Sequence, residues 1–120
     1  MESTVTITSP DPDELRTLNM WLRDEPELQR KVTLLPEPPQ QGEMSGGMLS
    51  GLAILAGQAG TLAVVARSLT SWLGPRRGKV SFVIRRPDGG EIEFTAEQTR
   101  GADMDDVHRV IERFLDGGAS

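Results

Sequence analysis

The chain contains no cysteine, a single histidine and few aromatic residues, with two tryptophans and three phenylalanines among its 120 residues. Without cysteine no disulfide, thiolate nucleophile or zinc–thiolate site can form, so the fold does not depend on the redox compartment. One histidine makes a Ser-His-Asp triad or a histidine-rich metal site hard to assemble. The expected large anchors of the core are Trp21, Trp72, Phe82, Phe94 and Phe114.

An excess of positive charge is also lacking, because the formal net charge is -5. This balance disfavours attraction to DNA or to anionic lipid, so nucleic acid is not an expected partner. The first residues carry neither the basic region nor the apolar run of a secretory signal, which predicts a cytoplasmic protein. The length suits one compact domain over residues 1–120, with residues 116–120 as a flexible tail.

Hydrophobic periodicity predicts an α+β fold in the order β-α-β-α-β-β-α. Apolar residues that alternate predict strands over residues 4–8, 31–35, 80–84 and 92–96, and the last two join in a hairpin through Pro87-Asp88-Gly89-Gly90. Apolar residues at helical spacing predict one helix between Asp11 and Pro26, a long one that ends at Gly74-Pro75, and a last one between Asp103 and Gly117. Residues 37–42 form a loop or a semi-rigid linker. A mixed sheet of about four strands, with helices packed on one or both faces, is the expected architecture.

The longest uncharged stretch, Met44 to Ala66, is rich in glycine and alanine. About 20 apolar residues suffice to cross a bilayer, but glycine and alanine add little transfer free energy. As a soluble helix, whole or broken near Gly57 to Gly60, it would lose about 1 kcal/mol for each interior glycine relative to alanine. Three interpretations follow, in order of preference: a helix buried on the protein's own sheet, an interface with another chain, and membrane insertion.

Small residues four apart in this stretch favour close contact between two backbones. Gly47 pairs with Gly51 in this spacing, Ala53 with Gly57, and Ala56 with Gly60. The predicted protein-interface residues are Gly47, Gly51, Ala53, Gly57, Gly60 and Trp72. The pattern predicts a homo-oligomer, or docking of a partner on the long helix.

Outside this stretch, the sequence offers only weak candidates for a catalytic, ligand-binding or metal-binding site. His108 with Asp105 and Glu112 fits a solvated helix face better than a base or a metal ligand. The basic residues Arg76, Arg77, Lys79, Arg85 and Arg86 fit a charged strand edge better than a ligand site. The acidic groups near residues 11–14 and 103–106 are explained by helix N-termini, and their spacing matches no calcium loop. We therefore expect no enzyme, no cofactor and no metal.

Several segments carry a family resemblance: "WLRDEPELQRKV" at residues 21–32, "PPQQGEMSGG" at 38–47 and "SWL" at 71–73, followed by "RPDGGEIEFTA" at 86–96. With the Gly/Ala-rich stretch between them, they resemble effector-associated constant component one, a small domain of bacterial conflict systems found mainly in actinobacteria. The resemblance implies a short α+β protein without catalytic motifs, encoded beside effectors such as caspase-like or trypsin-like proteases and acting in antiviral defence. Sensor, adaptor and scaffold roles all stay open. A membrane-associated component that inserts the 44–66 helix is the alternative.

Overall fold

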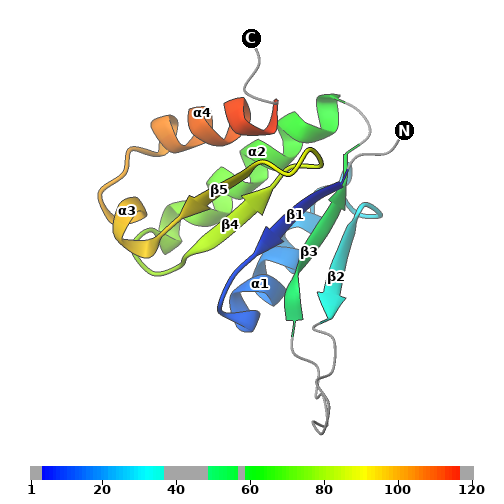
Figure 1. Ribbon diagram of the computed structural model, residues 1–120, viewed down its shortest axis with the longest axis horizontal. Coiled ribbons are helices and arrows are strands. Elements are labelled where there is room, and N and C mark those ends of the chain that lie inside the picture. Colours follow the sequence, from blue (N-terminus) through cyan, green and yellow to red (C-terminus); the bar gives the residue numbers. More distant parts are fainter. Residues whose placement is uncertain (1–3, 37–48, 57–58, 117–120) are drawn as a thin grey trace, which may run out of the picture.

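One sheet and a layer of helices make up the part of the chain that the computed structural model describes, residues 4–36, 49–56 and 59–116 (Figure 1). The strands are β1 (Thr4–Thr8), β2 (Val32–Pro36), β3 (Leu49–Leu55), β4 (Phe82–Arg85) and β5 (Glu91–Phe94). The helices are α1 (Pro12–Arg23), α2 (Ala59–Leu73), α3 (Ala96–Arg100) and α4 (Met104–Leu115), and a 3-10 turn at Gly74–Arg76 follows α2. The predicted loop at 37–42 and residues 117–120 of the predicted tail lie outside the described residues.

The five strands are ordered β2-β3-β1-β4-β5, and every neighbouring pair is antiparallel. Helix α1 connects β1 to β2 across β3, and α2 connects β3 to β4 across β1. These two interleaved split β-α-β units form the ferredoxin-like arrangement, to which β5 adds the second arm of a hairpin. Because such crossovers are right-handed, both helices lie on the same face of the sheet, behind the strands in Figure 1.

The hydrophobic core lies between this face of the sheet and the helices. Alternate residues of the three middle strands point into it: Val5 and Ile7, Leu52 and Ile54, and Phe82 and Ile84. Helix α2 packs between α1 and α4, so the helices form a layer with α2 in its centre. No described helix covers the opposite, open face of the sheet, where Thr4, Thr6 and Thr8 are half-buried.

Capping aspartates begin α1 and α4, at the two helix starts that the sequence predicted. Asp11 accepts a hydrogen bond from the backbone N–H of Asp13 at 3.0 Å, and Pro12 opens α1. Asp103 accepts from the N–H of Asp105 at 2.8 Å and opens α4. Both predicted helix starts are confirmed, and so are the first strand and the hairpin.

The α+β class is confirmed, but the sheet has five strands rather than about four, and it is antiparallel throughout rather than mixed. The predicted helix is confirmed from Ala59 to its end before Gly74-Pro75, but its earlier part is wrong, because residues 49–55 form β3 between β1 and β2. Leu52 and Ile54 of β3 point into the core, while Gly51 and Ala53 alternate with them toward the open face. None of the described helices combines the length and the hydrophobicity needed to cross a membrane.

Gly51 occupies a position in β3 where the neighbouring backbone leaves no room for a side chain. A Cβ atom there would lie 2.7 Å from the carbonyl oxygen of Ile7 on β1. Gly60, in the first turn of α2, has open space instead, since nothing lies within 4 Å of the equivalent Cβ. Of these two glycines, only Gly51 is required by the close approach of a neighbouring strand.

A short helix, α3, replaces the end of the last predicted strand. Strand β5 ends at Phe94, and Thr95 then caps α3 by accepting from the N–H of Gln98 at 3.2 Å, while the Gln98 side chain accepts from the N–H of Thr95 at 3.1 Å. This reciprocal pair is a capping box. The prediction that Ala96 continues the strand is therefore wrong.

The two tryptophans have opposite environments. Trp72 is 2 % exposed and meets Phe82 edge-on, with ring centroids 6.3 Å apart. Trp21 is 46 % exposed, so its predicted place as a core anchor is wrong. Its indole N–H donates to the carbonyl oxygen of Ser68 on α2 at 3.0 Å, which holds the ring at the junction of α1 and α2.

Candidate protein interface

Of the six residues predicted to form an interface, the four that the structure describes do not lie on one surface. Gly51 is buried in β3 and Ala53 is half-buried on the open face of the sheet. Gly60 is exposed at the start of α2, and Trp72 is enclosed in the core. The other two, Gly47 and Gly57, lie outside the described residues. Because residues 49–55 form a strand, the small residues cannot share the single helix face on which the prediction rested.

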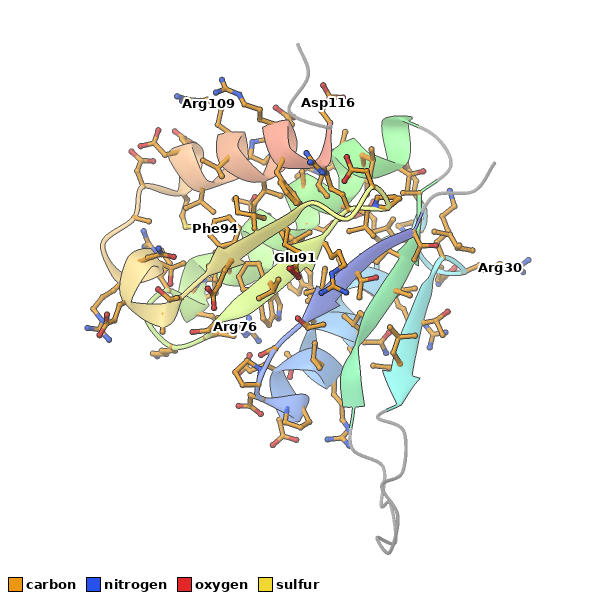
Figure 2. All side chains as sticks on the ribbon, in the orientation of Figure 1. Arg30, Arg76, Glu91, Phe94, Arg109 and Asp116 are labelled. Atoms are coloured by element: carbon orange, nitrogen blue, oxygen red, sulfur yellow. The ribbon has the colours of Figure 1, made fainter. Side chains whose placement is uncertain are left out.

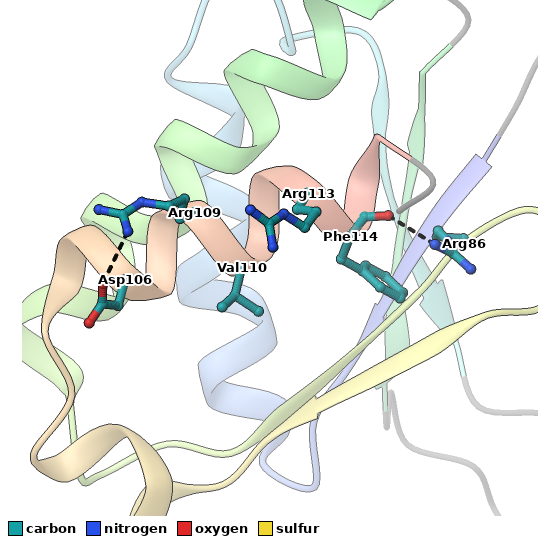
Figure 3. A pocket seen from close by; sticks show the side chains of 6 residues that line it. All are labelled: Arg86, Asp106, Arg109, Val110, Arg113 and Phe114. Carbon is teal, nitrogen blue, oxygen red and sulfur yellow. Dashed lines mark hydrogen bonds and ion pairs between the residues drawn. The ribbon is translucent and has the colours of Figure 1, made fainter. Parts of the chain in front are cut away.

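A cleft of about 560 Å³ opens instead between α4 and the turn of the β4–β5 hairpin. We call it the α4 cleft, and Figure 3 shows the residues that line it: Arg86, Asp106, Arg109, Val110, Arg113 and Phe114. The apolar stripe of α4 is wider than the face that this helix turns to the core. Its buried members are Val107, Ile111 and Leu115, which leaves Val110, 44 % exposed, and the half-buried Phe114 to line the cleft.

Arg86 joins the hairpin turn to the end of α4. Its guanidinium donates to the carbonyl oxygen of Phe114 at 3.2 Å and lies over the Phe114 ring, 4.6 Å from the centroid (Figure 3). Its Nε donates to the Asp88 carboxylate at 3.1 Å. These contacts fix one wall of the cleft, because they bind a side chain of the turn to both the backbone and the ring at the helix end.

The other two arginines of the cleft are more available to a partner. Arg109 lies 3.6 Å from Asp106 in an exposed pair, and it projects outward from α4 in Figure 2. Such an exposed pair is weak, so it can exchange for another carboxylate at little cost. Arg113 is exposed and pairs with no residue in the described ranges. The cleft therefore combines apolar lining with positive charge.

The carboxylate of Asp88 stabilises the hairpin turn beside the cleft. The Gly90 backbone N–H donates to it at 2.8 Å and, with Arg86, holds the pKa of that carboxyl below its ordinary value of 3.8. A group with a lowered folded-state pKa contributes stability above its unfolded pKa and loses it as the pH falls through the folded value.

We expect a carbon-detected NMR titration of the side-chain carboxyls to give Asp88 a pKa below 3.8, with the turn signals of Gly89 and Gly90 shifting over the same acidic range. The cause is the preference of both donors for the charged carboxylate. In Asp88→Asn the turn signals should no longer shift in that range. An Asp88 pKa at or above 3.8 would contradict the assignment.

A second surface lies at the C-terminal end of α1. Met20 is 73 % exposed and Trp21 is 46 % exposed, and Asp24 and Glu25 border a hollow of about 170 Å³ beside the Trp21 ring. We call Met20, Trp21, Asp24 and Glu25 the α1 patch. Glu25 lies 3.8 Å from Arg67 of α2, and Asp24 is exposed. This surface combines apolar side chains with negative charge.

The basic cluster predicted around the third expected strand is dispersed by the fold. Arg76 pairs with Glu14 at 3.5 Å, Arg77 donates to the carbonyl oxygen of Ala102 at 2.9 Å, and Arg85 pairs across the hairpin with Glu91 at 2.7 Å. Only Arg86 of this group lines the α4 cleft. Within the described ranges, no three histidine or acidic side chains lie close enough to hold a metal ion.

The sequence profile of a family described as Effector Associated Constant Component 1 matches residues 7–115, nearly the whole chain. No curated protein and no solved structure matches it. Both the α1 patch and the α4 cleft fall inside the matched range.

Proposed function

The chain belongs to the effector-associated constant component one family, and on that premise we propose that it is a non-enzymatic adaptor of a bacterial conflict system. In this role it couples an invader signal to a separately encoded effector. The family match over residues 7–115 is the observation that carries the proposal. The two surfaces, each with exposed apolar side chains beside charge, support it as places where a protein partner could bind.

The effector class that fits the family is a caspase-like or trypsin-like protease. An adaptor without chemistry of its own acts on such an enzyme by binding it, by changing its conformation or by bringing copies of it together. Clustering raises the effective concentration of tethered enzymes without any new catalytic group. This chain therefore supplies binding surfaces, and the protease supplies the nucleophile.

The test is to purify the chain together with each protein encoded beside its gene and to measure complex formation by size-exclusion chromatography with light scattering. We expect one neighbour to co-elute with the chain in a defined ratio. We also expect the complex to cleave a protein substrate, and this cleavage to disappear when the catalytic nucleophile of the neighbour is replaced. The proposal fails if no neighbouring gene product binds the chain, or if proteolysis persists without the neighbour's nucleophile.

A further inference from the structure

Large exposed hydrophobic side chains are few in the described part of the chain: Met20, Trp21, Leu55 and Val110. Three of them belong to the α1 patch and the α4 cleft. Exposed apolar side chains that lie together beside charges mark protein contacts more often than isolated ones do. The α1 patch has projecting side chains and an excess of negative charge, whereas the α4 cleft is hollow and has an excess of positive charge.

The charges of the two surfaces are opposite. The α1 patch carries Asp24 and Glu25, with Arg67 of α2 beside Glu25 in the same hollow, so one negative charge is in excess there, whereas the α4 cleft carries three arginines and one aspartate. Two copies of a chain with a net charge of -5 repel each other at long range, and a local pairing of opposite charges offsets part of that repulsion. The arginines of the cleft, with Arg113 unpaired in the described ranges, supply that pairing for the carboxylates of the patch.

The apolar parts of the two surfaces also fit each other. The cleft is open to solvent, and its volume of about 560 Å³ leaves room for large side chains of a partner. Met20 is flexible and adapts to an irregular cavity. Trp21 is held by its hydrogen bond to Ser68, so it loses little conformational freedom on binding. Tryptophan is also among the residues that contribute most to binding energy at protein contacts.

The two surfaces cannot meet within one molecule, because α2 packs between α1 and α4 (Figure 1). We infer that the α1 patch of one copy binds in the α4 cleft of a second copy. The two halves of this contact differ, so it is heterologous, and each bound copy offers a free patch and a free cleft to the next. Copies therefore assemble head to tail into a ring or a filament. This inference rests on the proposed function, since such an array would hold several effectors side by side.

Two variants separate the halves of the contact. Met20→Arg places a positive charge on the patch, and Val110→Glu/Arg113→Glu places negative charges in the cleft, all at exposed positions. Wild-type protein should grow in average mass with concentration in sedimentation velocity, and less so at high salt. Each variant alone should associate at least about tenfold more weakly. An equimolar mixture should give a heterodimer and nothing larger, because one intact patch then meets one intact cleft.

Leu55→Arg is the matched control, because Leu55 is also exposed, at 39 %, but lies on the open face of the sheet. It should assemble like the wild type. The inference is overturned if the wild type stays monomeric at every concentration, if the mixture yields no heterodimer, or if Leu55→Arg blocks assembly while Met20→Arg does not.

Binding of the effector by the same variants distinguishes the two proposals. If monomeric Met20→Arg still binds the neighbouring gene product, the proposed function stands whatever the result on self-association. If the wild type is monomeric and only the Val110→Glu/Arg113→Glu variant loses the effector, the cleft receives the effector instead, and the head-to-tail inference is wrong. If no variant and no wild-type protein binds an effector, the proposed function itself fails.

Discussion

Replacing Gly51 with alanine is expected to lower the free energy of unfolding by about 3 kcal/mol. The added Cβ would stand 2.7 Å from the Ile7 carbonyl oxygen, a distance that forces β1 and β3 apart at the centre of the sheet. Gly60→Ala is the matched control. It should raise the free energy of unfolding by about 0.5–1 kcal/mol, since the methyl group meets open space in a helix.

Urea unfolding followed by circular dichroism measures both changes. Equal stabilities of the Gly51→Ala variant and the wild type would show that β1 and β3 do not approach as described. The result also bears on assembly experiments. A residue larger than alanine at Gly51 should destabilise the sheet further, so loss of oligomers in such a variant would say nothing about an interface.

Replacing Trp72 with alanine is expected to lower the free energy of unfolding by about 3–5 kcal/mol. The indole is 2 % exposed and contacts Phe82 edge-on, so its removal leaves a cavity between α2 and β4. Trp72→Phe should lose less. It keeps an aromatic ring and removes an indole N–H that is buried without a hydrogen-bond partner among the described residues.

Trp21→Ala is the matched control for Trp72→Ala, because the Trp21 ring is about half exposed and makes one hydrogen bond. It should lose about 1 kcal/mol and keep the fold. Denaturant midpoints compare the variants, and acrylamide should quench the fluorescence of Trp21 far more than that of Trp72. A larger stability loss in Trp21→Ala than in Trp72→Ala would contradict the assigned environments.

Much of the fold could be predicted because its signals are local. An acidic residue before Pro12, and another at Asp103, each mark a helix start through the next few backbone N–H groups alone. The alternation of Val5 and Ile7, and the turn around Asp88, depend in the same way on near neighbours. The short helix α3 carried such a signal too, in the Thr95–Gln98 capping box.

The stretch around β3 could not be assigned from periodicity. A short apolar run fits a buried strand and a buried helix equally, and only the positions of β1 and β2 on either side of it decide. The exposure of the two tryptophans could not be predicted for the same reason. Both lie near apolar stripes of their helices, and only the way α1 packs on α2 leaves Trp21 partly exposed. The α4 cleft could not be predicted from the sequence either. It exists because Arg86 and Phe114, far apart in the chain, meet at the end of α4.

The place of β1 in the sheet has a consequence for synthesis on the ribosome. The first strand to be made is the middle strand of the sheet, and its two neighbours are β3 and β4, the second of which begins only at Phe82. Until the residues of β4 leave the ribosome, β1 can pair only with β3, and its other edge has no partner strand and stays open to other chains. The dependence on distant contacts also predicts slow folding for a chain of this size. For this protein, translation must pass the turn of the β4–β5 hairpin before β1 can pair with both of its neighbours in the sheet.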